Sequence, residues 1–329
     1  MSTASVQQSH GIFAGECAPV YRQRQEVIDG MRKVYRQVRR GDRVDLDAVE
    51  QWVSGLLDAV NADMEMALWV TNLRNPDDYP YVHAVNVCVL TLGLCHSLGF
   101  ERGQLLEIGV GALLHDIGQA RTPTHILDKP GQLTREEFDI MQRHPEDGYR
   151  MMLAAGRLTD LSLAIIRSHH ERIAGTGYPD QLTATAIATP VLATAIVDVY
   201  DALVSDRRYR QGLPADVAIQ AMYQNAESNY GRELMQAFIR FIGVYPVGCV
   251  VELDNGGVGL VVSAREHARL LPRVLLIRDA DGSFLEQRRL IDLTEADTTG
   301  GWYVRRVVSS SDLGLDVAAI IRAECLLPG

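Results

Sequence analysis

Two adjacent histidines, His169 and His170, open the stretch HHERIAGTGYPDQL at residues 169–182. Successive residues of a helix diverge by about 100°, so neighbouring imidazoles cannot share one apolar face. Two imidazoles directed into adjoining parts of one cavity would instead suit a metal ion, because imidazole is a common ligand of transition metals. This interpretation requires further ligands elsewhere in the chain.

Other polar residues stand where the surrounding sequence is apolar or where a helix is expected to end. With the histidine pair they form a set of five histidines and two aspartates: His83, His115, Asp116, His144, His169, His170 and Asp198. A lone histidine is more often a hydrogen-bonded core residue, but an unpaired buried aspartate is costly unless a cation offsets it. Seven ligands exceed what one ion takes from a protein, so we expect two divalent transition metal ions. Mixed His/Asp ligation favours Fe or Mn, with Ni or Zn as alternatives, and disfavours Ca or Mg.

The composition is that of a globular protein without a low-complexity tract. The 329 residues are 47% hydrophobic and 22% charged, and this length suggests two domains. The net charge of −10 argues against a nucleic-acid partner, although Arg207, Arg208 and Arg210 provide local positive charge for a small phosphorylated ligand. The five scattered cysteines, without a CxxC pair, argue against a disulfide framework and for a reducing compartment. No secretory leader is recognisable, so we expect a cytoplasmic protein.

The uncharged stretch at 79–100 is long enough to cross a bilayer. It contains His83, Asn86, His96 and Ser97, so we interpret it as a buried helix of a soluble bundle and expect no membrane partner. Helical periodicity continues beyond it, and LTREEF at 133–138 predicts a helix start with a capping box.

Changes in hydrophobic periodicity divide the chain into four segments. We expect a mobile tail, N-terminal helices, a catalytic helical domain and a small β-barrel with a C-terminal helix at 1–18, 19–74, 75–243 and 244–329. The N-terminal helices are expected at 19–40 and 45–73. The second helix carries an apolar stripe of coiled-coil type: Leu46, Val49, Val53, Leu56 and Val60. The stripe either packs on the rest of the bundle or forms the seam of a homodimer.

The last segment has the alternation and turns of β-strands. Two hairpins are expected at 247–263 and 273–293, and a short helix at about 313–326. Four short strands suggest an SH3-like barrel. It carries no chemical motif, so we interpret it as a structural or partner-docking module.

The motifs of the helical segment resemble a known family. His115–Asp116 matches the HD doublet of the HD phosphohydrolase superfamily, and HHERIAGTGYP at 169–179 with VDVYDALVSDRRYR at 197–210 resembles the HD-GYP subfamily over residues 75–240. The resemblance implies an HD-type helical bundle with two or three metal ions. It also implies a hydrolase of bacterial signalling, a phosphodiesterase that converts cyclic di-GMP to linear pGpG and in some members onward to GMP.

The resemblance assigns the seven residues listed above as metal ligands, with His115 and Asp116 at the catalytic centre and Asp116 bridging the ions. At such a dinuclear site a bridging water becomes hydroxide near neutral pH and attacks phosphorus in line. Arg207 and Arg210 are candidates for holding the non-bridging oxygens of the diester.

The loop after the paired histidines carries further candidates. Gly177-Tyr178-Pro179 is either a rigid turn or a functional loop, in which Tyr178 stacks on a guanine or the loop docks a GGDEF-domain protein. Glu171 and Arg172 either orient the ligand histidines or form an ion pair at a helix end.

Three positions depart from the family pattern. Gln119 stands where the family has a phosphate-binding lysine, and Ala174 stands where Asp is common. Tyr79 stands where members with three metals carry Glu, so we expect two metals here. The alternatives are a catalytically weak or inactive module that binds cyclic di-GMP or a partner, and a phosphodiesterase for pGpG or another cyclic dinucleotide.

Overall fold

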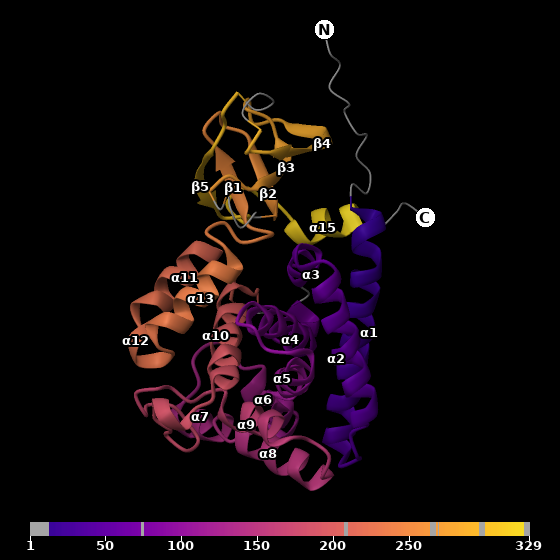
Figure 1. Cartoon of the computed structure of the whole chain (residues 1–329), viewed down its shortest axis with the longest axis vertical. Helices are drawn as coiled ribbons and strands as arrows, with labels where there is room; N and C mark the ends of the chain where they lie inside the picture. The colour runs from indigo at the N-terminus through magenta and orange to yellow at the C-terminus, as the bar shows by residue number, and fades with distance from the viewer. Residues whose placement is uncertain are drawn as a thin grey trace.

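The computed structural model describes residues 13–73, 76–206, 210–263, 268, 270–295 and 300–325. A helical body forms one end of the molecule and a small β-sheet the other, with a short C-terminal helix lying between them (Figure 1). The expected fold class, a mainly helical chain followed by a small β-module, is therefore confirmed.

The N-terminal region contains three helices, α1 (Ala14–Arg40), α2 (Leu46–Ala62) and α3 (Met64–Thr71). Helix α1 begins inside the segment predicted as a tail, and residues 1–12 lie outside the described residues. The single helix predicted at 45–73 is interrupted at Asp63, whose carboxylate accepts a hydrogen bond from Met66 N at 2.9 Å and so caps a new helix. All five stripe residues of α2 are buried within the chain, so the stripe packs on the bundle and is not a free dimer seam.

The central helical region is built around α4, which is buried continuously from residue 82 to residue 95. Its α-helices are α4 (Tyr79–Ser97), α5 (Arg102–Leu114), α6 (Thr124–Leu127), α7 (Arg135–Met141), α8 (His144–Ala155), α9 (Asp160–Ser168), α10 (Thr189–Val204), α11 (Ala215–Gln224), α12 (Ala226–Asn229) and α13 (Arg232–Ile242). Short 3-10 turns connect them at η1 (Pro76–Asp78), η2 (Ile117–Arg121) and η3 (Ala184–Ala186). The capping box of α7 is confirmed, with Thr134 and Glu137 bonding each other's main chain. Among the described residues no helix combines the length and apolarity needed to cross a membrane.

The β-module is a five-stranded antiparallel sheet of order β4-β3-β2-β1-β5. Its strands are β1 (Val250–Leu253), β2 (Val258–Ser263), β3 (Arg273–Arg278), β4 (Phe284–Asp292) and β5 (Val304–Val308). Both predicted hairpins are confirmed, whereas β5 was not predicted. Successive residues of β2 and β3 are buried. Since alternate residues of a strand point to opposite sides, both faces of these two strands are covered. Leu260 and Leu275 face the helical body, while Val261 and Val274 face a smaller core inside the module.

The C-terminal helix α15 (Val317–Cys325) packs against α1. Cys17 of α1 and Cys325 of α15 form a disulfide across 308 residues, a pairing that was not expected from the scattered cysteines, which had argued against a disulfide framework. Sequence spacing gave no sign of the pairing, because only the fold brings the two ends of the chain together. Cys88, Cys95 and Cys249 are free.

Candidate metal centre

Five helical elements bring the seven candidate ligands to one place. His83 lies in the first turns of α4, and His115 and Asp116 follow the last residue of α5. His144 is the first residue of α8, while His169 and His170 directly follow α9. Asp198 lies in the middle of α10. All are buried except His170, which is partly buried.

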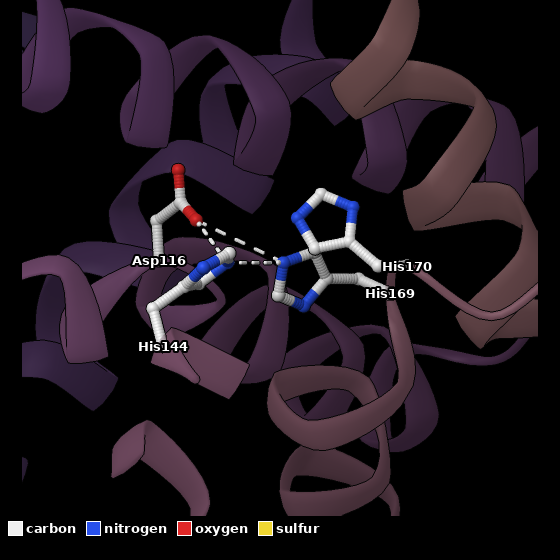
Figure 2. Close-up of side chains that lie close together, drawn as sticks. All are labelled: Asp116, His144, His169 and His170. Atoms are coloured by element: carbon white, nitrogen blue, oxygen red, sulfur yellow. Dashed lines mark hydrogen bonds and ion pairs between the residues drawn. The ribbon is translucent and has the colours of Figure 1, made fainter. Parts of the chain in front are cut away.

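The seven side chains form two groups. The first contains Asp116, His144, His169 and His170, whose candidate ligand atoms lie within 4.8 Å of one another. Figure 2 shows one Asp116 oxygen facing both His144 and His169. That oxygen, Oδ1, lies 3.1 Å from His144 Nε2 and 3.8 Å from His169 Nε2.

The second group contains His83, His115 and Asp198. Asp198 Oδ1 lies 3.0 Å from His83 Nε2 and 3.8 Å from His115 Nε2. The other oxygen of Asp116, Oδ2, lies 3.4 Å from His115 Nε2 and 4.0 Å from His83 Nε2. Asp116 therefore faces both groups, one carboxylate oxygen toward each.

The hydrogen bonds of the imidazoles leave their Nε2 lone pairs directed into the site. Three histidines donate Nδ1–H to a main-chain carbonyl one turn earlier, namely His115 to Ala112, His144 to Met141 and His169 to Ile166, at 2.8, 2.8 and 3.0 Å. A neutral ring that donates through Nδ1 has only an acceptor at Nε2. Such carbonyl partners are the usual means of orienting metal-binding histidines.

Two of these lone pairs point at each other, which is unfavourable without a cation. His144 Nε2 and His169 Nε2 are 3.3 Å apart. Two nitrogens bound to one ion at about 2.0–2.1 Å would be about 2.8–3.4 Å apart in octahedral or tetrahedral geometry. His115 Nε2 is buried and has no hydrogen-bond partner among the described residues. The donor set therefore fits divalent transition metals.

The electrostatics of the first group favour the protonation states that bind metal. Burial and the neighbouring imidazoles lower the pKa of His169 and of His170 well below the usual value. Burial raises the pKa of Asp116, but His115 and His144 lower it by more, so the net pKa lies well below normal. Neutral imidazoles and an ionised carboxylate are the forms that coordinate a metal.

Asp201 is a site residue that the sequence reasoning did not select. Its Oδ2 lies 2.7 Å from His83 Nδ1, so the other ring nitrogen, Nε2, is the one that lies 3.0 Å from Asp198 Oδ1 inside the site. The available signal was its position: Asp201 follows Asp198 by three residues in a buried helix, on the same face.

The loop after the histidine pair is held by Glu171. Its buried carboxylate accepts hydrogen bonds from Asp180 N at 2.6 Å and Leu182 N at 3.0 Å. Glu171 thus anchors the loop main chain, which is neither of the two roles considered for it. Arg172 donates to the carbonyl oxygens of His169 and Glu171, so its guanidinium closes the end of the helix.

The Gly177-Tyr178-Pro179 segment borders the first group. A Cβ at Gly177 would lie 2.4 Å from Glu171 Cα, so only glycine fits this close approach. The Tyr178 ring lies 4.7 Å from the His170 ring, centroid to centroid. In the second group the Tyr79 ring stacks on the His83 ring, with the centroids 5.2 Å apart.

The candidate phosphate-binding residues are less well placed by the structure. Arg207 lies outside the described residues. Arg210 is exposed and donates to the carbonyl oxygens of Ala202 and Leu203 at the end of α10. Gln119 is partly buried in η2, three residues after Asp116, and Ala174 is exposed.

Comparison with known proteins agrees with this architecture. Residues 73–234 match the HD domain, and residues 250–313 match a KOW domain associated with HD domain. The central helical region of the chain is therefore an HD domain.

Two curated relatives carry related names. Cyclic di-GMP phosphodiesterase PA4108 of Pseudomonas aeruginosa is 35% identical over 266 residues, which are 81% of this chain and 64% of the relative. The 3'3'-cGAMP-specific phosphodiesterase 1 of Vibrio cholerae is 32% identical over 177 residues, 53% of this chain and 40% of the relative. The chain thus spans less than two thirds of the length of either protein.

A solved structure shares the fold. It is Bd1817, a HDG"Y"P protein from Bdellovibrio bacteriovorus, with a TM-score of 0.55 and 20% identity over 66% of this chain and 69% of that chain.

Proposed function

We propose that this protein is a metal-dependent phosphodiesterase that hydrolyses cyclic di-GMP to pGpG. The observation that carries the proposal is the pair of facing acceptor clusters joined by Asp116. The HD-domain match and the name of the PA4108 relative support the reaction class and the substrate.

The two groups suit two divalent ions. His144, His169 and His170 would hold one ion and His83, His115 and Asp198 the other, with Asp116 contributing one oxygen to each. Bound ions would lower the pKa of a water molecule to about 7 and neutralise charge on the phosphoryl oxygens. Tyr79 stands at the position where a third ligand set would need a carboxylate, which supports two ions.

The remaining residues of the site shape its mouth. Glu171 fixes the loop that carries Tyr178, and the Tyr178 ring beside His170 offers a surface on which a guanine can stack. Gln119 would donate a neutral hydrogen bond to a substrate phosphate. Arg207 and Arg210 remain candidates for the same charge-stabilising role.

A second candidate function is hydrolysis of 3'3'-cGAMP, which the name of the Vibrio cholerae relative favours. The two substrates differ only in one base, so the same metal chemistry would serve both.

Product analysis separates these functions. The purified chain is loaded anaerobically with Fe(II) or Mn(II) and given cyclic di-GMP, 3'3'-cGAMP or pGpG in separate reactions, and the products are resolved by chromatography. We expect pGpG from cyclic di-GMP at the highest kcat/KM. Faster turnover of 3'3'-cGAMP would reassign the substrate, and bound metal without turnover of any of the three would make the domain a binding module.

A further inference from the structure

Helix α1 precedes the matched HD domain, yet one of its side chains connects to the metal centre. Arg24 is buried, with 1% of its surface exposed, and its Nη2 donates to Asn86 Oδ1 at 3.2 Å. Asn86 Nδ2 donates to Asp201 Oδ1 at 3.0 Å, and Asp201 Oδ2 lies 2.7 Å from His83 Nδ1. We propose that Arg24 is a positioning residue for the metal ligand His83, acting through Asn86 and Asp201. The inference rests on the proposed metal-dependent function.

The direction of each hydrogen bond in this series is fixed by chemistry. Guanidinium is only a donor, so the side chain of Asn86 must turn its oxygen toward Arg24. The amide nitrogen then serves two acceptors, Asp201 Oδ1 and Thr71 O, both at 3.0 Å. Both N–H groups of Asn86 are therefore used, and the amide cannot flip without losing its partners.

Asp201 in turn fixes the tautomer of His83. Its carboxylate also accepts from Ser205 Oγ at 3.3 Å, so donors hold both oxygens in place. A carboxylate at Nδ1 keeps a proton of His83 on that nitrogen, so Nε2, which lies 3.0 Å from Asp198 Oδ1, is the nitrogen that a metal ion would take in place of a proton. Removing a carboxylate that is hydrogen-bonded to a ligand histidine typically lowers metal affinity or activity by about 10- to 100-fold.

Arg24 sets the position of the whole series. Its Nη2 also donates to Leu73 O at 2.8 Å, which ties α1 to the end of the N-terminal helices. Its positive charge favours the orientation in which the Asn86 oxygen points toward Arg24 and the Asn86 nitrogen points toward Asp201. An uncharged side chain at this position would leave the Asn86 oxygen without this donor, so only the two N–H groups of Asn86 would still hold the amide in line with Asp201.

The test measures metal affinity rather than turnover. Mn(II) is titrated into the full metal-free chain, free Mn(II) is followed by EPR, and His83→Ala identifies which of the two binding steps belongs to the His83 group. We expect Arg24→Met to weaken that step by about tenfold, the lower end of the range for groups behind a ligand, and to leave the other step unchanged. Arg24→Lys keeps the charge and should recover part of the affinity.

A matched control separates positioning from folding. Val27→Ala lies one turn along α1 at a fully buried position outside the series, so it should lower the Tm but leave both Mn(II) steps unchanged. Should Arg24→Met not fold, Asn86→Leu tests the same series and must weaken the same step. Wild-type affinity for both ions in folded Arg24→Met or Asn86→Leu would overturn the positioning role. Absence of Mn(II) binding in the wild type would instead overturn the proposed function, and with it this inference.

Discussion

Replacing Glu171 by glutamine should release the loop that borders the metal centre. The carboxylate accepts two main-chain N–H groups, from Asp180 and Leu182, at 2.6 and 3.0 Å. Glutamine keeps the shape but offers one acceptor, so one N–H loses its partner. A hydrogen bond to a charged group contributes about 1.5–3 kcal/mol. Because Asp180 is exposed and Leu182 partly buried, we expect the loss as local opening of the loop rather than global unfolding.

Amide hydrogen exchange measures this opening directly. A loss of about 1.5–3 kcal/mol corresponds to exchange that is faster by about 10- to 150-fold at the amides of Asp180 and Leu182. The matched control is Glu233→Gln, the same change at an exposed position of α13, which should leave the exchange unaltered. Unchanged exchange at both amides in Glu171→Gln would refute the anchoring role. Faster exchange throughout the chain would show that Glu171 stabilises the whole fold rather than the loop alone.

Three further changes test other parts of the site. Gly118→Ala places a Cβ 1.9 Å from His144 O. Urea denaturation should therefore show a free energy of unfolding that is lower by about 3 kcal/mol or more, the upper end of what overpacking usually costs. An unchanged urea midpoint would contradict the close packing of η2 on α8. Gln119→Lys adds a positive charge three residues after Asp116 and should lower the KM for cyclic di-GMP; an unchanged KM would remove Gln119 from the phosphate contacts. Chelation should lower the Tm, and Mn(II) should restore it. Mn(II) at 100 times its Kd should raise the free energy of unfolding by about 2.7 kcal/mol, whereas a Tm insensitive to metal would contradict binding to the native state.

The seven clustered residues were foreseeable because each is anomalous in its local sequence. Asp198 interrupts an apolar helix, and His169 and His170 cannot share one helical face, so the pattern alone indicated a polar cavity. The division into helices and strands was equally visible, since the hydrophobic period changes after residue 243.

Other features depend on contacts that spacing does not encode. Asp201 and Asp198 stand in the same apolar helix, and only the fold shows that Asp201 contacts Nδ1 of His83, 118 residues away. Glu171 was expected to act on histidines or on Arg172, but its acceptors serve main-chain groups nine and eleven residues later. Strand β5 reads VRRVV, in which two adjacent arginines break the alternation that marks a half-buried strand.

Metal content and cyclic di-GMP turnover, measured together on the wild type and on Asp116→Ala, test the central claim most directly. Asp139→Ala, at an exposed position of α7, is the matched control. The account predicts about two transition metals per chain and turnover in the wild type and in the control, with both lost in Asp116→Ala because this carboxylate faces both groups. Full activity with metal retained in Asp116→Ala would contradict it.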